Sequence, residues 1–306
     1  MGTLGRAAND AAFLVFSVLD QRLAFECRDA ALSALVVAES PGLPCADDME
    51  GQDPALRYTV SVNGNPPSFA LSRDGGTVLQ GTGGAAFLSM LEQDLTVELQ
   101  KRRPDLLFVH AAALEWQGGA CLLVAESGVG KSTTAWALLH HGFDYLSDEL
   151  APIDLTSLHV HPYPRALCLK EVPQEYPPPP GAVNLGVTTH IPAQALPRAP
   201  VYEPKPLSAI FLLSRMHVSG APAIRALAPG EAAARLYVHS LNPLAHGNRG
   251  LDAVADIAAR TPCFALTLAE LPASCALIEA TLAAGLKPDG GAKRAATAVS
   301  AKKVQL

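Results

Sequence analysis

The sequence predicts a mixed α/β protein whose N-terminal region is rich in β-strands. Two observations lead to this prediction. Residues 57–62 alternate between polar and apolar side chains and end in an Asn-Gly-Asn-Pro-Pro turn, a pattern typical of a strand. Further along, the apolar residues 121–125 precede a glycine-rich loop and a segment with helical periodicity, which is the strand–loop–helix order of α/β proteins.

The N-terminal region, residues 1–104, is expected to form the first domain and to end in a helix. An apolar run at residues 12–16 predicts one strand, and residues 57–62 predict a second. Residues 69–71 and 77–79 flank Asp-Gly-Gly and therefore predict a hairpin. Residues 85–102 have an apolar face at helical spacing, and Arg-Arg-Pro follows it.

Residues 105–286 are expected to form the second domain, and residues 287–306 a disordered tail with little apolar content. Residues 156–205 contain many prolines and predict an extended surface loop. The elements predicted in this domain are strands at 106–114, 121–125, 143–147, 209–213 and 263–268, and helices at 131–141, 230–240, 251–259 and 272–284.

Composition narrows the kinds of partner that we expect. The 306 residues are 49% hydrophobic and 17% charged, with a formal net charge of −6, so no general attraction to nucleic acid is expected. No stretch approaches the ~20 apolar residues of a membrane helix, and the N-terminus lacks the apolar run of a secretory signal. The six cysteines form no C-x-x-C pair, and Cys121, Cys168 and Cys263 lie in apolar runs that predict burial. We therefore expect a reduced, cytoplasmic setting.

The motif with the clearest chemistry is Ala125-Glu126-Ser127-Gly128-Val129-Gly130-Lys131-Ser132-Thr133. It matches the phosphate-binding pattern G-x-x-x-x-G-K-[ST], with alanine in place of the first glycine. Glycines let backbone N–H groups turn toward phosphate oxygens, and the positive end of the following helix dipole faces the same anion. These nine residues are therefore predicted to bind ATP, with Lys131 on the β- and γ-phosphates and the Ser132 hydroxyl on Mg²⁺.

Two acidic residues, Asp148 and Glu149, follow the strand after the loop helix. A strand–loop–helix–strand unit predicts a crossover that brings both strand ends to one edge of the sheet, where ligands gather. One carboxylate is expected to hold Mg²⁺ with Ser132, and the other to accept a proton from a substrate hydroxyl. A surface turn with solvated acids is the alternative.

His110 lies in an apolar strand before the loop, in Val109-His110-Ala111. With the loop and with Gly142-Phe143-Asp144-Tyr145-Leu146-Ser147-Asp148-Glu149, it resembles the catalytic domain of HPr serine kinase/phosphorylase and HPr-kinase-related proteins. That family has a histidine before the P-loop and an Asp-Asp pair after the loop helix. The spacing from Lys131 places His110 on this histidine, and Asp148 and Glu149 on the two aspartates.

The resemblance implies a P-loop fold of the HPr kinase and phosphoenolpyruvate carboxykinase type, with ATP-dependent transfer to a serine hydroxyl of a protein or peptide. By the same resemblance, Asp148 is expected to bind the metal. Glu149, whose counterpart in the family is an aspartate, is expected to occupy the position of the base. A further acidic metal ligand of the family has Glu171 as its candidate here. A nucleotide-binding module that regulates a partner and a scaffold with a degenerate site are the alternatives. The sequence leaves the acceptor and a homo-oligomeric state open.

Overall fold

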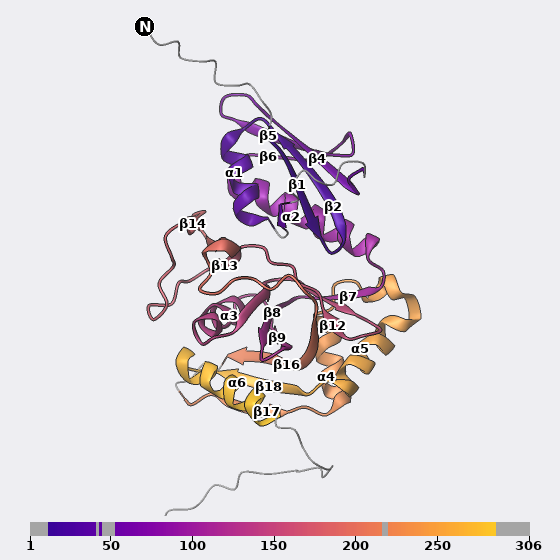
Figure 1. Ribbon diagram of the computed structural model, residues 1–306, viewed down its shortest axis with the longest axis vertical. Helices are drawn as coiled ribbons and strands as arrows, with labels where there is room; N and C mark the ends of the chain where they lie inside the picture. The colour runs from indigo at the N-terminus through magenta and orange to yellow at the C-terminus, as the bar shows by residue number, and fades with distance from the viewer. Residues whose placement is uncertain (1–11, 41–42, 45–52, 216–219, 286–306) are drawn as a thin grey trace, which may run out of the picture.

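The computed structural model describes residues 12–40, 43–44, 53–215 and 220–285, and the predicted tail lies outside them. The chain forms a small N-terminal unit and a larger unit (Figure 1). The larger unit holds residues 125–133, which are called the phosphate loop after their predicted role. A long helix, α2 (Gly84–Arg102), leads from the first unit into the second. The boundaries that the sequence suggests for the domains stay a prediction.

The N-terminal unit is a six-stranded sheet in the order β3-β1-β2-β4-β5-β6, covered by two helices. Tyr58 and Val60 point inward from β4, and Phe25, Phe69 and Phe87 pack together against them. Besides α2, the elements are β1 (Ala12–Val18), β2 (Gln21–Cys27), α1 (Ala30–Glu39), β3 (Leu43–Pro44), β4 (Leu56–Asn63), β5 (Ser68–Arg73) and β6 (Gly76–Gly81).

The N-terminal predictions are confirmed for β1, β4, the β5–β6 hairpin and α2. Strands β2 and β3 and helix α1 were not predicted from the sequence. Helix α1 begins after Asp29, whose side chain accepts a hydrogen bond from the N–H of Leu32, a standard N-terminal cap. Its residues are so uniformly apolar that they give no helical pattern.

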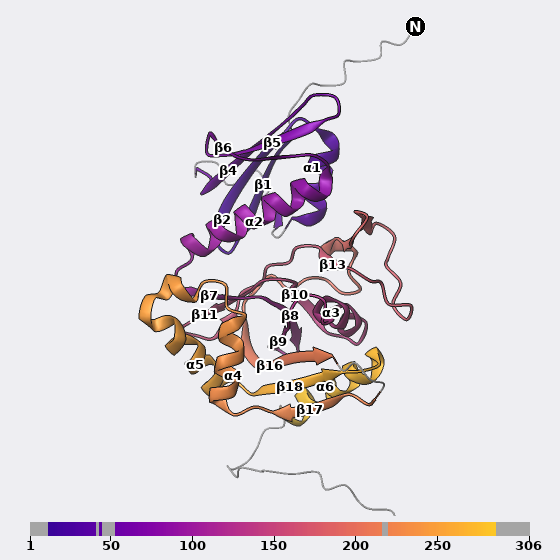
Figure 2. The ribbon, with the colours of Figure 1, turned by 180° about the vertical axis from the view of Figure 1, so that it is seen from behind.

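The larger unit has three layers, with a mostly buried sheet between two pairs of helices (Figures 1 and 2). Cys121 and Leu123 face α3 and α6, whereas Leu122 and Val124 face α4 and α5. The elements of these layers are β7 (Leu106–Val109), β8 (Ala111–Trp116), β9 (Gly119–Val124), α3 (Lys131–His140), β10 (Asp144–Ser147), β11 (Ala151–Asp154), β12 (His159–Val160), β16 (Lys205–Arg215), β17 (Ala223–Ala226), α4 (Pro229–Val238), α5 (Gly250–Arg260), β18 (Cys263–Leu268) and α6 (Leu271–Gly285).

The crossover after the phosphate loop differs in one detail from the prediction. The sheet order begins β10-β8-β9, so β8 lies between the two strands that α3 connects. Because β8 is antiparallel to both neighbours, β9 and β10 run in the same direction. The end of β9 and the end of β10 therefore lie at the same edge, as the sequence predicts.

Two predictions for this unit are wrong in part. The strand expected at 106–114 is broken at His110 into β7 and β8, which lie far apart in the sheet order. The proline-rich segment 156–205 is not only a surface loop, because Leu167, Leu169 and Ile191 are fully buried against the core. It contains a three-stranded sheet of β13 (Leu167–Leu169), β14 (Val183–Asn184) and β15 (Thr189–Ile191).

Candidate functional site

The phosphate loop connects β9 to α3 with the backbone that the motif requires. Gly128 and Gly130 have φ angles of 89° and 120°, a region that favours glycine. A Cβ on Gly130 would also lie 3.4 Å from Leu268. Ala125 is buried, so a small side chain fits where the motif has its first glycine. Helix α3 begins at Lys131 without a side-chain cap, which leaves its N-terminal dipole facing the loop.

Lys131, His110 and Glu149 meet beside this loop, although they are distant in the sequence. The Nζ of Lys131 lies 2.9 Å from Nε2 of His110 and 3.4 Å from Oε2 of Glu149. Because an ammonium group only donates, Nε2 accepts, and the proton of the neutral ring is on Nδ1, 3.5 Å from the same Glu149 oxygen. The break between β7 and β8 turns the His110 ring toward Lys131 and Glu149. The backbone N–H of His110 donates a hydrogen bond to the backbone carbonyl of His239.

Burial and the charge of Lys131 lower the pKa of His110, which keeps its ring neutral near pH 7. For Glu149, burial alone would raise the pKa, but the positive charge of Lys131, with smaller contributions from the His110 ring and Arg165, holds it below its ordinary value. Glu149 is therefore ionised, and its carboxylate faces an ammonium group and an imidazole N–H.

Asp148 points in another direction and is fully buried. Its Oδ1 accepts a hydrogen bond from Oγ of Ser132 at 3.1 Å, and its Oδ2 accepts one from the N–H of Cys168 at 3.4 Å. Burial raises the pKa of Asp148, and the charge of Lys131 opposes that rise. A hydroxyl oxygen beside a carboxylate is a donor set that suits a hard cation such as Mg²⁺.

A cavity of about 260 Å³ lies between the phosphate loop and Glu149. Of the predicted loop residues, Ala125 and Val129 do not line it, and Val129 packs against the core instead. The residues around the cavity are Glu126, Ser127, Gly128, Gly130, Lys131, Ser132, Thr133, Glu149, Cys168, Lys170, Glu171, Thr188 and Arg215.

Two cationic residues of this cavity, Lys170 and Arg215, were not predicted as site residues from the sequence. The Nζ of Lys170 donates to Oγ of Ser127 at 2.9 Å, so it is held against the phosphate loop. Arg215 ends β16, which runs parallel to β9 and therefore finishes at the same edge as the loop. The rule that ligands gather at strand ends would have found Arg215, whereas Lys170 has no such pattern around it.

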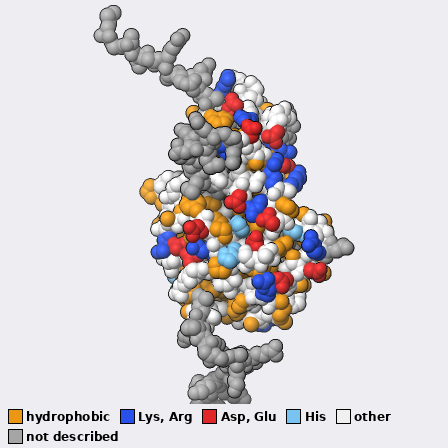
Figure 3. All heavy atoms as spheres, turned by 45° about the vertical axis from the view of Figure 1, so that its right-hand side comes forward, with side chains coloured by type: hydrophobic (Ala, Val, Ile, Leu, Met, Phe, Trp, Pro, Cys, Tyr) orange, Lys and Arg blue, Asp and Glu red, His pale blue; other side chains and the backbone are white. Residues whose placement is uncertain are grey.

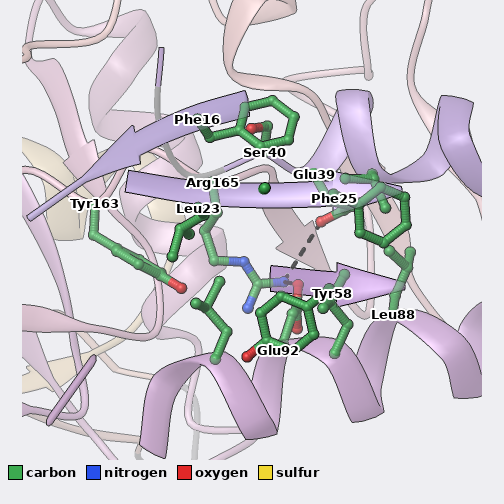
Figure 4. Close-up of a pocket in the computed structure, with 14 residues that line it drawn as sticks. Phe16, Leu23, Phe25, Glu39, Ser40, Tyr58, Leu88, Glu92, Tyr163 and Arg165 are labelled. Carbon is green, nitrogen blue, oxygen red and sulfur yellow. Dashed lines mark ion pairs between the residues drawn. The ribbon is translucent and has the colours of Figure 1, made fainter. Parts of the chain in front are cut away.

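A buried charged cluster lies behind Asp148 and joins the two units. Arg165 pairs with Glu92 of α2, and its Nη2 lies 3.6 Å from Glu39 at the end of α1 (Figure 4). The other oxygen of Glu39 lies 2.5 Å from Nδ1 of His190. Cys168 lies 3.3 Å from the Arg165 guanidinium, so it is part of this cluster and not the buried apolar side chain that its sequence context predicted. Histidine, acidic and basic side chains also gather on one face of the surface (Figure 3).

Comparison with known proteins gives one curated relative and a distant structural neighbour. No family model matches the chain. The HPr kinase/phosphorylase of Lactobacillus delbrueckii subsp. bulgaricus is 44% identical over 94 residues, which are 31% of this chain and 25% of that protein. This match confirms the resemblance to the HPr-kinase-related family. The matched stretch is only about a quarter of the relative's length.

The solved structure of the HPr(Ser) kinase/phosphatase from Coxiella burnetii aligns with 58% of this chain and 88% of its own, at 15% identity. Its TM-score of 0.33 is too low to establish a shared fold. The mixed α/β class is confirmed by the chain's own layers, and the finer fold type belongs to the proposal below. Among the residues that the structure describes, no helix combines the length and apolar character needed to cross a membrane.

Proposed function

We propose that this chain is an ATP-dependent kinase that transfers the γ-phosphate to a serine-type hydroxyl of a protein or peptide. The observation that carries the proposal is the meeting of Lys131, His110 and Glu149 beside the phosphate-loop cavity, which Lys131 and Glu149 line. This arrangement combines a cation for phosphate, a carboxylate for a hydroxyl proton and an imidazole ring that contacts both. The proposal includes the P-loop fold type of the HPr kinase family.

The nucleotide phosphates would lie in the cavity of about 260 Å³. Backbone N–H groups from Gly128 to Ser132 and the N-terminus of α3 favour anions there. Lys131, Lys170 and Arg215 line the same cavity and add positive charge. This set of groups supports ATP as the phosphoryl donor.

Magnesium is the metal that the site chemistry favours, and Ser132 and Asp148 would hold it. The Ser132 hydroxyl already lies 3.1 Å from the Asp148 carboxylate, and Mg²⁺ prefers oxygen ligands of these kinds. Bound there, the ion would neutralise charge on the phosphates. Glu171 lines the same cavity and is proposed as a further acidic group near the metal.

Glu149 is proposed as the group that accepts the proton of the acceptor hydroxyl. The hydroxyl oxygen would form a bond to the γ-phosphorus while the bond from that phosphorus to the β,γ-bridging oxygen breaks, which releases ADP. The lowered pKa of Glu149 keeps the carboxylate ionised and ready to accept a proton at neutral pH. His110 would orient this carboxylate through Nδ1–H, and Lys131 would stabilise charge on the phosphate.

The alternative is a nucleotide-binding module that regulates a partner with little phosphoryl transfer. The same ion pair favours it, because a carboxylate whose pKa is lowered by Lys131 is a weak base. In this alternative Glu149 has a structural role, and ATP binding changes the surface that the partner contacts.

Incubation with ATP labelled on its γ-phosphate, magnesium and a pool of serine-containing peptides tests the proposal, with ATP affinity measured in parallel by calorimetry. We expect transfer by the wild-type chain and its loss in Glu149→Gln, with ATP affinity retained. Lys101→Ala is the control, because Lys101 is exposed and pairs only with Glu98 among the described residues. ATP binding without transfer to any peptide would favour the regulatory module, and no ATP binding would contradict both.

A further inference from the structure

A second and larger cavity, of about 700 Å³, is lined by Glu149 but by no residue of the phosphate loop. The two cavities share Glu149, Cys168 and Thr188, and His110 lines the larger one. We propose that this cavity binds the phosphoryl acceptor, that helix α2 of the N-terminal unit forms its wall, and that its ligand is an uncharged peptide segment carrying the hydroxyl. This inference rests on the proposed kinase function.

The position of the cavity supports the assignment. In-line transfer needs the donor phosphate and the acceptor hydroxyl on opposite sides of the reacting phosphorus, with a base beside the hydroxyl. Glu149 borders both cavities, and the phosphate loop borders only the smaller one. A hydroxyl in the larger cavity can therefore reach Glu149 without displacing the nucleotide.

Helix α2 presents one continuous face to this cavity. Its opposite face is buried in the N-terminal core through Phe87, Leu91, Leu95 and Leu99. Residues three or four positions apart lie on the same side of a helix, so the core residues and the cavity residues of α2 form two different faces. The α2 residues that line the cavity are Ala85, Leu88, Ser89, Glu92, Gln93, Thr96, Val97 and Gln100.

The buried charged cluster holds this face in place. Glu92 and Glu39 come from the N-terminal unit, and both approach Arg165 of the larger unit, with Glu39 also beside His190. Buried charges are stable only when paired, so displacement of α2 would expose or strand these carboxylates. Helix α2 is therefore held against the larger unit, and the cavity is not a gap between two independent units.

The chemistry of the lining selects an uncharged ligand. Among the described residues around the cavity, the charge of Glu92 is compensated by Arg165, and that of Glu149 by Lys131, which lines the smaller cavity. An anionic ligand would meet two carboxylates, and a cationic ligand would meet the guanidinium. The hydrogen-bonding groups without charge on α2 are the side chains of Ser89, Gln93, Thr96 and Gln100.

A peptide segment matches these groups. Each peptide unit offers an N–H and a C=O, which glutamine and hydroxyl side chains can bind from both directions. Val97, Val187 and Leu241 line the same cavity with 44%, 78% and 44% of their surface exposed, and they would contact apolar side chains of the peptide. A volume of about 700 Å³ is within the range of sites for small ligands, so it would hold a few residues around the hydroxyl.

The test uses three pools of short peptides with one serine and capped ends, in which the neighbours of the serine are uncharged, acidic or basic. We expect the uncharged pool to be phosphorylated at least about tenfold faster than either charged pool. Val97→Trp places a large ring in the cavity, and Gln93→Glu adds a charge. Each should slow transfer about tenfold or more while the affinity for ATP stays within about twofold.

Val37→Trp is the matched control, because Val37 is 45% exposed on α1 and does not line the cavity. It should leave transfer unchanged, and melting curves check the folding of all three variants. If the wild type phosphorylates peptides but Val97→Trp and Gln93→Glu keep full activity, the acceptor site is wrong and the kinase function stands. Preference for a charged pool, or transfer only to glycerol or a nucleoside, overturns the ligand class. Absence of ATP binding defeats the kinase function itself.

Discussion

Replacing Arg165 with methionine removes the positive charge from the buried cluster that joins the two units. Arg165 is 9% exposed and pairs with Glu92 and Glu39, and the guanidinium lies in a pocket of the N-terminal unit (Figure 4). Methionine fills a similar volume without charge, so the effect reports the ion pairs more than packing. Removing one partner of a buried ion pair typically costs 3–5 kcal/mol, because the other charge stays buried.

The structure favours the lower end of that range. Glu39 also lies 2.5 Å from His190, whereas Arg165 is the only ion-pair partner of Glu92 among the described residues. One carboxylate is therefore left without compensation, which costs about 3 kcal/mol at neutral pH. Burial already raises the pKa of Glu92, and loss of Arg165 raises it further. Protonation of Glu92 limits the cost, so the loss of stability should be smaller at acidic pH than at pH 8.

Unfolding by urea at pH 8 and pH 5, together with thermal melting, measures this effect. For a chain of this size, about 3 kcal/mol corresponds to a decrease of roughly 6 °C in Tm. Arg260→Met is the control, because the Arg260–Asp256 pair is exposed on α5 and is worth at most about 1 kcal/mol. The double variant Arg165→Met/Glu92→Leu should recover much of the stability. A loss in Arg165→Met no larger than in the control, or no recovery in the double variant, would refute the argument.

Three further predictions concern the site and the pH dependence. Lys131→Ala should weaken ATP binding about 10- to 100-fold in calorimetry, because a contact between a charged donor and phosphate is lost, while circular dichroism shows that the fold is retained; Lys101→Ala should bind ATP normally. Asp148→Asn should reduce the dependence of ATP binding on magnesium. Glu149→Gln should keep its affinity for ATP and slow phosphoryl transfer by about 10²- to 10⁴-fold. If the two variants behave alike, the proposed roles of metal ligand and base are wrong. Burial and Arg103 lower the pKa of His161 below its unfolded value of about 6.5, so the unfolded chain binds more protons than the folded chain near and below that pH. The free energy of unfolding should therefore fall as the pH decreases through about 6.5. His161→Asn should flatten this pH dependence in urea titrations, and an unchanged dependence would contradict the prediction.

The phosphate loop was predictable from the sequence because its geometry is local. Strand β9, the glycines and helix α3 follow one another within a short segment, so spacing alone fixes their arrangement. The edge occupied by Asp148 and Glu149 was also predictable, since a crossover brings strand ends to the same edge even with β8 between them. In contrast, the position of the His110 ring depends on a break in a strand that looks continuous in the sequence.

The charged cluster and the wall of the larger cavity could not be predicted in this way. Glu39, Glu92, Arg165 and His190 come from four segments, and each alone has the pattern of an ordinary surface residue. The prolines of segment 156–205 suggested a loop, and its strands have only two or three residues, too few for a periodic pattern. The side chains of these strands are buried by tertiary packing against α3, which the local sequence pattern does not predict.

The backbone at Glu149 connects these observations to the proposed chemistry. Its φ angle of 79° is uncommon for a residue with a side chain and costs on the order of 1 kcal/mol or more. The turn sends adjacent carboxylates to different places, Asp148 to Ser132 and Glu149 to Lys131 and His110. An extended chain would also separate neighbouring side chains, but it would carry the second one away along the strand. The strained turn leaves Glu149 at the boundary of the two cavities and Asp148 buried against Ser132, which is the separation that the proposed roles of base and metal ligand require.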